Sequence, residues 1–149
     1  MGRRTSQDEA APSRVFVDSS TWFAVASASD GRHAEADGLL RHAVAGRIGL
    51  LTTNLVLAEV HRLTLVRMGI RPAAAMLDRI EASGLVSIVH ATAEHHRGAR
   101  RWLAKLADQP ISYADAVSFA VMEAGRCRMA MTFDHHFALA GFRIWSLGR

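Results

Sequence analysis

Hydrophobic positions along this chain follow two alternating patterns, and the first consists of short, continuous apolar runs. These runs are rich in β-branched residues and do not alternate with polar positions, which is typical of strands buried on both faces. A parallel sheet covered by helices contains strands of this kind, whereas a strand with one face in water alternates. The runs predict strands at 14–17, 48–52, 86–89, 128–133 and 143–147.

The second pattern is a recurrence of apolar residues at intervals of three and four, the spacing of an amphipathic helix. In the clearest case one helix face would carry Ala36, Leu39, Leu40, Ala43 and Val44. Thr53 or Asn54 is placed to cap the helix that follows the second strand. The pattern predicts helices at 21–28, 32–46, 55–68, 72–84, 92–106, 113–124 and 135–140.

This alternation of strands and helices predicts a single α/β domain over 14–149. Strands separated by helices of this length pair in parallel, with helices on both faces of the sheet. We therefore expect a central parallel sheet of about five strands flanked by helices. Two successive helices, 92–106 and 113–124, separate the third strand from the fourth, and we expect them to form a hairpin. The polar segment 1–13 has no apolar face and is expected to be a flexible tail.

Four acidic residues come together at one edge of this predicted sheet, because parallel strands all end at the same edge. Asp18 directly follows the first strand, and Asp134 directly follows the fourth. Glu59 and Asp115 lie close to the starts of two helices that begin at this edge. In open parallel sheets, ligands bind beyond the carboxyl ends of the strands.

Glu59 is the most informative of the four acids. Apolar residues occupy the positions three and four before it and four and seven after it, so Glu59 lies on the apolar face of its helix. An unpaired carboxylate on such a face costs several kcal/mol in desolvation. Either an ion pair, with Arg14 or Arg62, or a bound cation would compensate that cost.

Each aspartate also has a simpler explanation. Asp18 and Asp134 are placed to cap helices, and Ser112 with Asp115 resembles a capping box. Caps do not explain why three aspartates arrive beside a buried glutamate, since clustered carboxylates repel and raise one another's pKa. A cation would neutralise the cluster, and oxygen ligands with open positions suit Mg²⁺ or Mn²⁺, which also bind phosphates. The residues therefore indicate metal-assisted phosphodiester chemistry.

Four segments resemble, in order and spacing, the successive motifs of the PIN domain: VFVDSSTWFA, TTNLVLAEV, ISYADAVSFAVM and TFDHHF. The resemblance covers residues 14–147 and is closest to the bacterial VapC-like ribonuclease toxins. It implies a Mg²⁺- or Mn²⁺-dependent endoribonuclease. Such an enzyme cleaves RNA by in-line attack of metal-activated water and leaves 5′-phosphate and 3′-hydroxyl ends.

The resemblance also implies roles and partners. By position in the motifs, the catalytic and metal-binding acids are Asp18, Glu59, Asp115 and Asp134. The hydroxyl of Thr132 matches the one that the family places beside the last acid, and Ser19 and Ser112 are further candidates for positioning water or metal. For a toxin, the resemblance implies a homodimer and a small antitoxin protein, encoded next door, that covers the site.

Two other functions are compatible with the same fold. One is a PIN-type RNA-processing nuclease without a toxin role. The other is a phosphoacceptor or phosphatase-like α/β domain with Asp18 as nucleophile. That second alternative is disfavoured because Ser20 stands where a haloacid-dehalogenase site has an aspartate. In addition Lys105, the only lysine, falls inside a helix and not after a late strand, as in receiver domains.

The charge balance favours a polyanionic substrate. The chain has 18 Lys and Arg against 14 Asp and Glu, a net charge of +4. If the four acids are reserved for metal, 10 acidic residues remain against 18 basic ones, so the rest of the surface is distinctly basic. Arg97, Arg101 and Lys105 recur every four residues on one helix face and would contact RNA phosphates. A solvated helix face explains this spacing at least as well.

Cysteine content and hydropathy indicate the compartment. The single cysteine, Cys127, cannot form an internal disulfide, which favours a reducing environment. No apolar run approaches the roughly 18 residues that a membrane-spanning helix requires. We therefore expect a cytoplasmic protein without a membrane segment.

Overall fold

The computed structural model describes residues 12–147, in which five strands and seven helices alternate. Most of the predicted tail, residues 1–11, lies outside the described residues, as do residues 148–149. Among the helices of the described part, none is both long enough and apolar enough to cross a membrane.

The five strands form one fully parallel sheet in the order β3–β2–β1–β4–β5. They are β1 (Arg14–Val17), β2 (Gly49–Thr53), β3 (Val86–Val89), β4 (Met129–Met131) and β5 (Arg143–Ile144). β1 lies in the centre, where Val15, Phe16 and Val17 are completely buried. Phe16 pairs with Leu51 on one side and with Ala130 on the other. Because β1 is central and buried on both faces, Asp18 at its end lies in the middle of the carboxyl edge.

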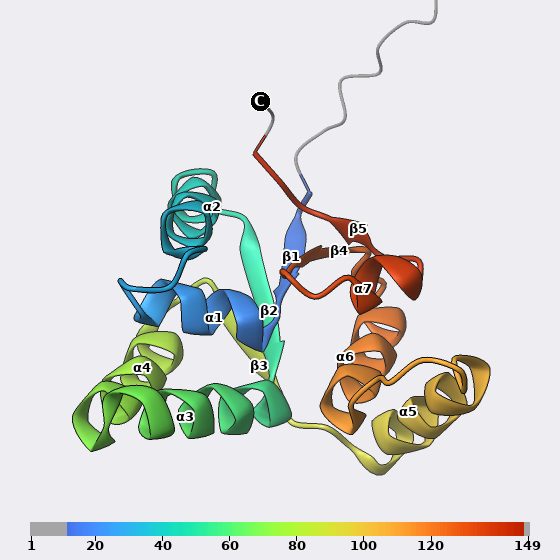
Figure 1. The fold of residues 1–149 in the computed structure, drawn as a ribbon. Coiled ribbons are helices and arrows are strands. Elements are labelled where there is room, and N and C mark those ends of the chain that lie inside the picture. The colour runs from blue at the N-terminus through green and yellow to red at the C-terminus, as the bar shows by residue number, and fades with distance from the viewer. Residues whose placement is uncertain (1–11, 148–149) are drawn as a thin grey trace, which may run out of the picture.

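Seven helices cover the sheet, with α1 to α4 gathered on one side and α5 to α7 on the other (Figure 1). They are α1 (Ser19–Ala26), α2 (His33–Ala45), α3 (Asn54–Met68), α4 (Ile70–Ala82), α5 (Ala93–Lys105), α6 (Tyr113–Ala124) and α7 (His136–Leu139). The predicted architecture is confirmed, since every expected strand and helix occurs at its place in the chain. Thr53 is the residue that caps α3, accepting a hydrogen bond from the backbone N–H of Val56 at 3.1 Å.

The boundaries of several elements differ from the prediction. α1 begins two residues earlier than predicted, and β5 has only two residues. β4 ends at Met131, two residues before the predicted end. The backbone N–H groups of Phe133 and Asp134 donate to the hydroxyls of Ser20 and Thr132, at 3.1 and 3.0 Å, instead of extending the sheet. These hydrogen bonds turn the chain across the end of β1.

The prediction that α5 and α6 form a hairpin is wrong. Contacts between the two helices advance in the same direction along both, from His96 with Tyr113 to Trp102 with Phe119. The loop 106–112 carries the chain back to the start of α6 (Figure 1). Seven extended residues span up to about 23 Å, which suffices to return along a 13-residue helix of about 20 Å. The start of α6 still lies at the carboxyl edge of the sheet.

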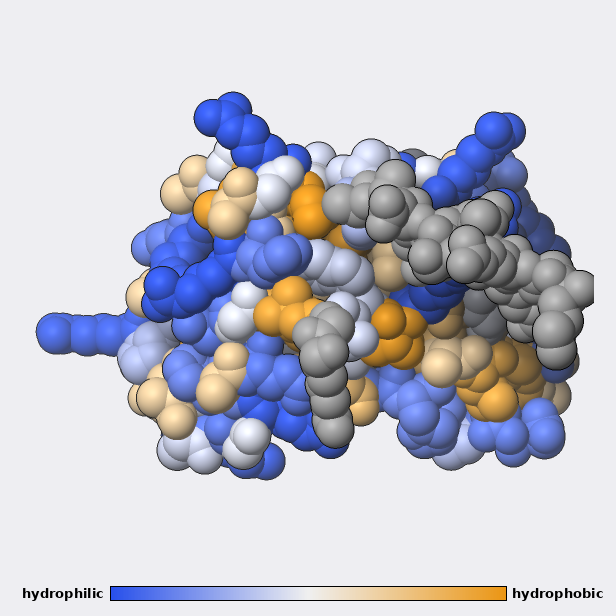
Figure 2. Space-filling model, turned by 90° about the horizontal axis from the view of Figure 1, so that it is seen from above, coloured by the Kyte–Doolittle hydropathy of each residue, from blue (hydrophilic) through white to orange (hydrophobic). Residues whose placement is uncertain are grey.

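The two ends of the sheet differ in character. Figure 2 shows the end at which the strands begin, where apolar residues form separate spots among hydrophilic ones. At the opposite end, where β1 and β4 stop, polar side chains from several elements meet around one depression.

Candidate active site

The four predicted acids meet at the carboxyl edge of the sheet, although they are far apart in the chain. Asp18 lies between β1 and α1, Glu59 in the second turn of α3, Asp115 in the first turn of α6, and Asp134 between β4 and α7. All four line one open pocket of about 360 Å³. The other polar side chains that line it are Ser19, Ser20, Ser112 and His136. The structure therefore brings together the residues that the topology of a parallel sheet predicted.

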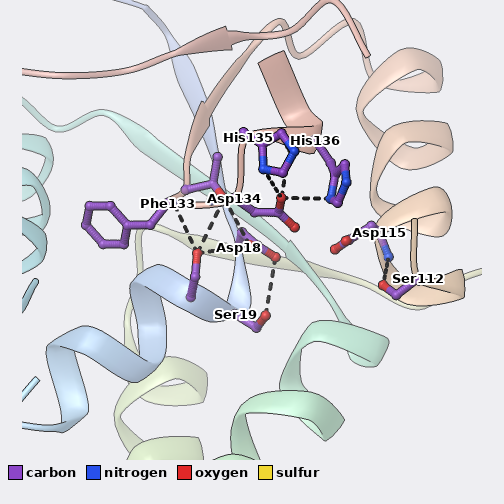
Figure 3. Close-up of polar contacts among 10 residues, drawn as sticks. Asp18, Ser19, Ser112, Asp115, Phe133, Asp134, His135 and His136 are labelled. Carbon is purple, nitrogen blue, oxygen red and sulfur yellow. Dashed lines mark hydrogen bonds and ion pairs between the residues drawn. The ribbon is translucent and has the colours of Figure 1, made fainter. Parts of the chain in front are cut away.

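Asp18 is the most buried of these acids, with 2% of its surface exposed. Three hydroxyls surround its carboxylate. Thr132 and Ser20 both donate to Oδ2 at 3.0 Å, and Ser19 donates to Oδ1 at 3.4 Å (Figure 3). Burial raises the pKa of Asp18 above its ordinary value, and the hydrogen bonds from Thr132 and Ser20 oppose that rise. Asp18 occupies the N-cap position of α1, but its side chain makes no capping hydrogen bond, so the capping explanation fails for this carboxylate.

Thr132 connects two of the acids. Its hydroxyl donates to Asp18 and accepts a hydrogen bond from the backbone N–H of Asp134 at 3.0 Å. Ser20 makes a similar connection from the other side, since it donates to Asp18 and accepts from the backbone N–H of Phe133. The sequence motifs indicated Thr132 as a site residue, whereas Ser20 entered only as the residue that stands where a haloacid-dehalogenase site has an aspartate. The signal for Ser20 was its position two residues after an acid at the end of a central strand.

Glu59 is half-buried, and its Oε2 atom has no hydrogen-bond partner. Burial, followed by the charge of Asp18, raises the pKa of Glu59, and the nearby hydroxyl of Ser19 opposes that rise. The alternative of an ion pair is wrong within the described residues: Arg14 donates to the carbonyl of Gly125, and Arg62 is exposed. A buried carboxylate oxygen without a partner is costly, which indicates that a ligand completes its environment.

Asp115 projects its carboxylate toward Asp18 and Asp134 from the first turn of α6 (Figure 3). Ser112 caps this helix by accepting the backbone N–H of Asp115 at 3.1 Å, so half of the predicted capping box is present. Burial, then the charges of Asp18 and Asp134, raises the pKa of Asp115 to about 8. This carboxyl therefore holds a proton at neutral pH unless a cation is close.

Asp134 closes the pocket from the β4 side, with 27% of its side chain exposed. Its Oδ1 atom accepts the backbone N–H of His136 at 2.9 Å, but the N-cap residue of α7 is His135, which makes no side-chain capping hydrogen bond, so the prediction of Asp134 as the N-cap is wrong. The ring nitrogen Nδ1 of His136 also lies 2.9 Å from this oxygen, whereas Nδ1 of His135 is 3.8 Å away. The side chain of His135 is 82% exposed, whereas that of His136 is 13% exposed and lines the pocket.

The donor set fits a hard divalent cation. Four carboxyl groups share one pocket, three of them with raised pKa, and one buried oxygen of Glu59 lacks a partner. Oxygen donors with room for water and phosphate suit Mg²⁺ or Mn²⁺. Asp134, His135 and His136 also have donor atoms within 4.8 Å of one another, at the rim of the same pocket. The site thus has the composition of a metal-dependent phosphoryl-transfer centre.

The basic stripe of Arg97, Arg101 and Lys105 lies on the exposed side of α5. None of the three lines the carboxylate pocket. Arg97 lies 3.4 Å from Glu94, and Lys105 lies 4.9 Å from the centre of the Trp102 ring. At the start of α5, however, His96 contacts Tyr113 at 2.6 Å, directly beside Ser112 at the pocket rim. The stripe therefore starts near the candidate active site and leads away from it.

Fold and site together define a class of protein. Residues 15–143 match the family described as PIN domain. The match spans nearly all of the described residues, and the chain belongs to this family.

The particular relatives are VapC proteins. The chain is 37% identical over 128 residues to the 23S rRNA-specific endonuclease VapC20 of Mycobacterium tuberculosis, covering 86% of this chain and 95% of the relative. It is 30% identical over 127 residues to a VapC ribonuclease of Archaeoglobus fulgidus, covering 84% of this chain and 80% of the relative. These matches confirm the predicted resemblance.

Solved structures show the same relationship. The crystal structure of Mycobacterium tuberculosis VapC20, described as a sarcin-ricin loop cleaving toxin, superposes with a TM-score of 0.76 at 36% identity. The superposition covers 86% of this chain and 95% of the VapC20 chain. VapBC2 from Rickettsia felis, bound to a promoter DNA fragment, gives a TM-score of 0.66 at 13% identity over 89% and 97% of the two chains. FitAcB from Neisseria gonorrhoeae gives a TM-score of 0.65 at 14% identity, covering 89% of this chain and 96% of the FitAcB chain. The last two show a shared fold.

Proposed function

We propose that this protein is a divalent-metal-dependent endoribonuclease and the toxin of a toxin–antitoxin pair. The observation that carries the proposal is the convergence of Asp18, Glu59, Asp115 and Asp134 on one pocket, with an unpartnered buried oxygen on Glu59. The similarity to VapC20, whose names give it 23S rRNA specificity and a toxin's role, favours ribosomal RNA as the class of substrate.

The four acids would hold Mg²⁺ or Mn²⁺. The chemistry that such an ion supplies is activation of water at neutral pH and neutralisation of charge on the phosphate. The protein's own part is to fix the acids: hydroxyls of Thr132 and Ser20 hold one oxygen of Asp18, and Ser19 contacts the other. Asp115 retains a proton up to about pH 8 when no cation is near, which limits repulsion in the cluster.

Partners and location follow from the proposed role. A toxin of this kind is expected to act in the cytoplasm, to pair with an antitoxin protein that covers the pocket, and to form a homodimer. The basic balance of the chain, 18 Lys and Arg against 14 Asp and Glu, favours approach to RNA.

Induced expression in a bacterial host tests the toxin role. We expect growth arrest that disappears when Asp18 is replaced by asparagine, because the variant keeps the fold and loses the metal site. Sequencing of 5′-phosphate RNA ends after induction should then show cuts at a few defined positions. Normal growth together with RNA cleavage by the purified protein would instead support the RNA-processing nuclease.

Replacing the basic stripe tests whether α5 contacts RNA. In the variant Arg97→Ala/Arg101→Ala/Lys105→Ala we expect KM for RNA to rise about tenfold and the slope of log KM against log salt to fall by about 2, with kcat unchanged. The reason is that phosphate contacts contribute to binding and release counterions, but do not take part in the chemical step.

A matched control removes the same charge from the other side of the sheet. Arg41, Arg47 and Arg71 are exposed residues on or beside α2 and α4. Their triple alanine variant should keep the KM and salt dependence of the parent protein. Equal effects of the two variants would show that the stripe is an ordinary solvated helix face.

A further inference from the structure

Two nitrogen atoms of His136 contact the carboxylate of Asp134. The backbone N–H and the ring Nδ1 of His136 each lie 2.9 Å from Oδ1 of Asp134. The backbone N–H donates a hydrogen bond to this oxygen, whereas the ring nitrogen makes an ion-pair contact with it, and that contact is attractive only when Nδ1 carries a proton. Figure 3 shows the ring beside this carboxylate, on the side that faces Asp115.

The two neighbouring histidines differ in their environment. The side chain of His136 is 13% exposed and lines the carboxylate pocket, whereas that of His135 is 82% exposed. The next residue, Phe137, is completely buried, and its ring packs against those of Phe16 and Phe119 at centroid distances of 6.1 and 5.0 Å. α7 has only one turn, so this aromatic anchor fixes the backbone from which the His136 ring extends.

We propose that His136 is a positioning residue that holds the Asp134 carboxylate, through its Nδ1–H, in the orientation required to bind a divalent cation. The inference rests on the proposed role of Asp134 as a metal ligand. Both nitrogen atoms lie against Oδ1, which leaves Oδ2 for the cation. Without the ring, one backbone N–H remains and the partly exposed carboxylate can rotate. Binding of the cation must then fix the orientation of the carboxylate, and the entropy lost in doing so lowers the affinity for the cation.

Direct ligation by the histidine rings is the competing arrangement, since donor atoms of Asp134, His135 and His136 lie within 4.8 Å of one another. The two arrangements predict different results for His136→Asn and His136→Gln. The asparagine amide places its N–H where His136 has Nδ1, whereas the glutamine amide reaches the place of Nε2. If His136 acts as a hydrogen-bond donor to Asp134, asparagine substitutes for it and glutamine does not.

The experiment is a titration of the metal-free protein with Mn²⁺, followed by the electron paramagnetic resonance signal of the free ion. We expect His136→Ala and His136→Gln to bind Mn²⁺ about tenfold or more weakly than the parent, as for other residues that support metal ligands. His136→Asn should bind within about twofold of the parent, and so should the control His90→Ala, since His90 is exposed and does not line the pocket. Circular dichroism establishes that each variant is folded.

Cleavage of RNA, measured in parallel, separates this inference from the proposed function. Unchanged Mn²⁺ affinity in a folded His136→Ala overturns the inference even if the parent cleaves RNA. An asparagine variant as weak as the alanine variant overturns it too, in favour of direct ligation. Loss of affinity in His136→Ala with recovery in His136→Asn supports the inference even if no RNA is cleaved, a result that would reject the proposed function alone. A parent that binds no Mn²⁺ would reject both.

Discussion

Replacing Asp18 by asparagine is expected to lower kcat for RNA cleavage by about 1000-fold while the protein stays folded. Asp18 lies at the centre of the site and receives hydrogen bonds from Thr132, Ser20 and Ser19, so it contributes both charge and geometry to the cluster. Removing a preorganised group that stabilises charge in the transition state typically has an effect of this size. Burial already raises the pKa of Asp18, so the metal-free fold tolerates an uncharged amide of the same shape.

The measurement is single-turnover cleavage of labelled RNA at saturating Mg²⁺ or Mn²⁺, with thermal unfolding of the same samples. Asp78→Asn provides the matched control, since Asp78 is an exposed aspartate on α4 that does not line the pocket. It should cleave at the parent rate. More than a tenth of the parent rate in Asp18→Asn would mean that another residue is the centre of the site.

Replacing Asp115 by asparagine is expected to stabilise the metal-free protein at pH 8 by several kcal/mol. Burial and the charges of Asp18 and Asp134 raise the folded-state pKa of Asp115 from 3.8 to about 8. Between these values the folded state binds a proton that the unfolded state releases, so the stability of the metal-free protein falls as pH rises from about 4 to about 8. The raised pKa values of Asp18 and Glu59 act in the same direction.

Urea unfolding at pH 5 and pH 8, in chelator and in saturating Mn²⁺, measures this linkage. The parent should be less stable at pH 8 than at pH 5 in chelator, and Mn²⁺ should remove the difference because the cation binds the deprotonated acids. Asp115→Asn should show a smaller pH dependence in chelator and gain less from Mn²⁺. A metal-free parent that is equally stable at both pH values would contradict the claim that the deprotonated carboxylate cluster destabilises the folded protein.

Much of the site was predictable because all strands of a parallel sheet end at the same edge, so a residue that follows a strand in the sequence lies at that edge. Asp18 and Asp134 follow strands that end at one edge, and the helices of Glu59 and Asp115 begin there. The apolar neighbours of Glu59 also indicated that its carboxylate would be partly buried, which the unpartnered Oε2 atom bears out. Their roles as metal ligands and catalytic acids stay predictions until they are measured.

Other features depend on the path of the backbone, which local periodicity does not record. Ser20 and His136 join the site only because the chain turns after Met131, where side-chain hydroxyls take the N–H groups that would have extended β4. Hydropathy alone made both residues look like ordinary polar positions. The relative direction of α5 and α6 escaped prediction because it depends on whether the loop 106–112 turns sharply or runs back along the helix.

Cleavage of a 5′-labelled RNA by the purified protein, with and without divalent cation, tests whether the carboxylate cluster is a metal-dependent ribonuclease site. We expect no cleavage in chelator, cleavage on addition of Mg²⁺ or Mn²⁺ with new 5′-phosphate ends, and none by Asp18→Asn under either condition. Cleavage that persists in chelator, or that Asp18→Asn catalyses at the parent rate, would contradict the claim that this carboxylate cluster is a metal-dependent ribonuclease site.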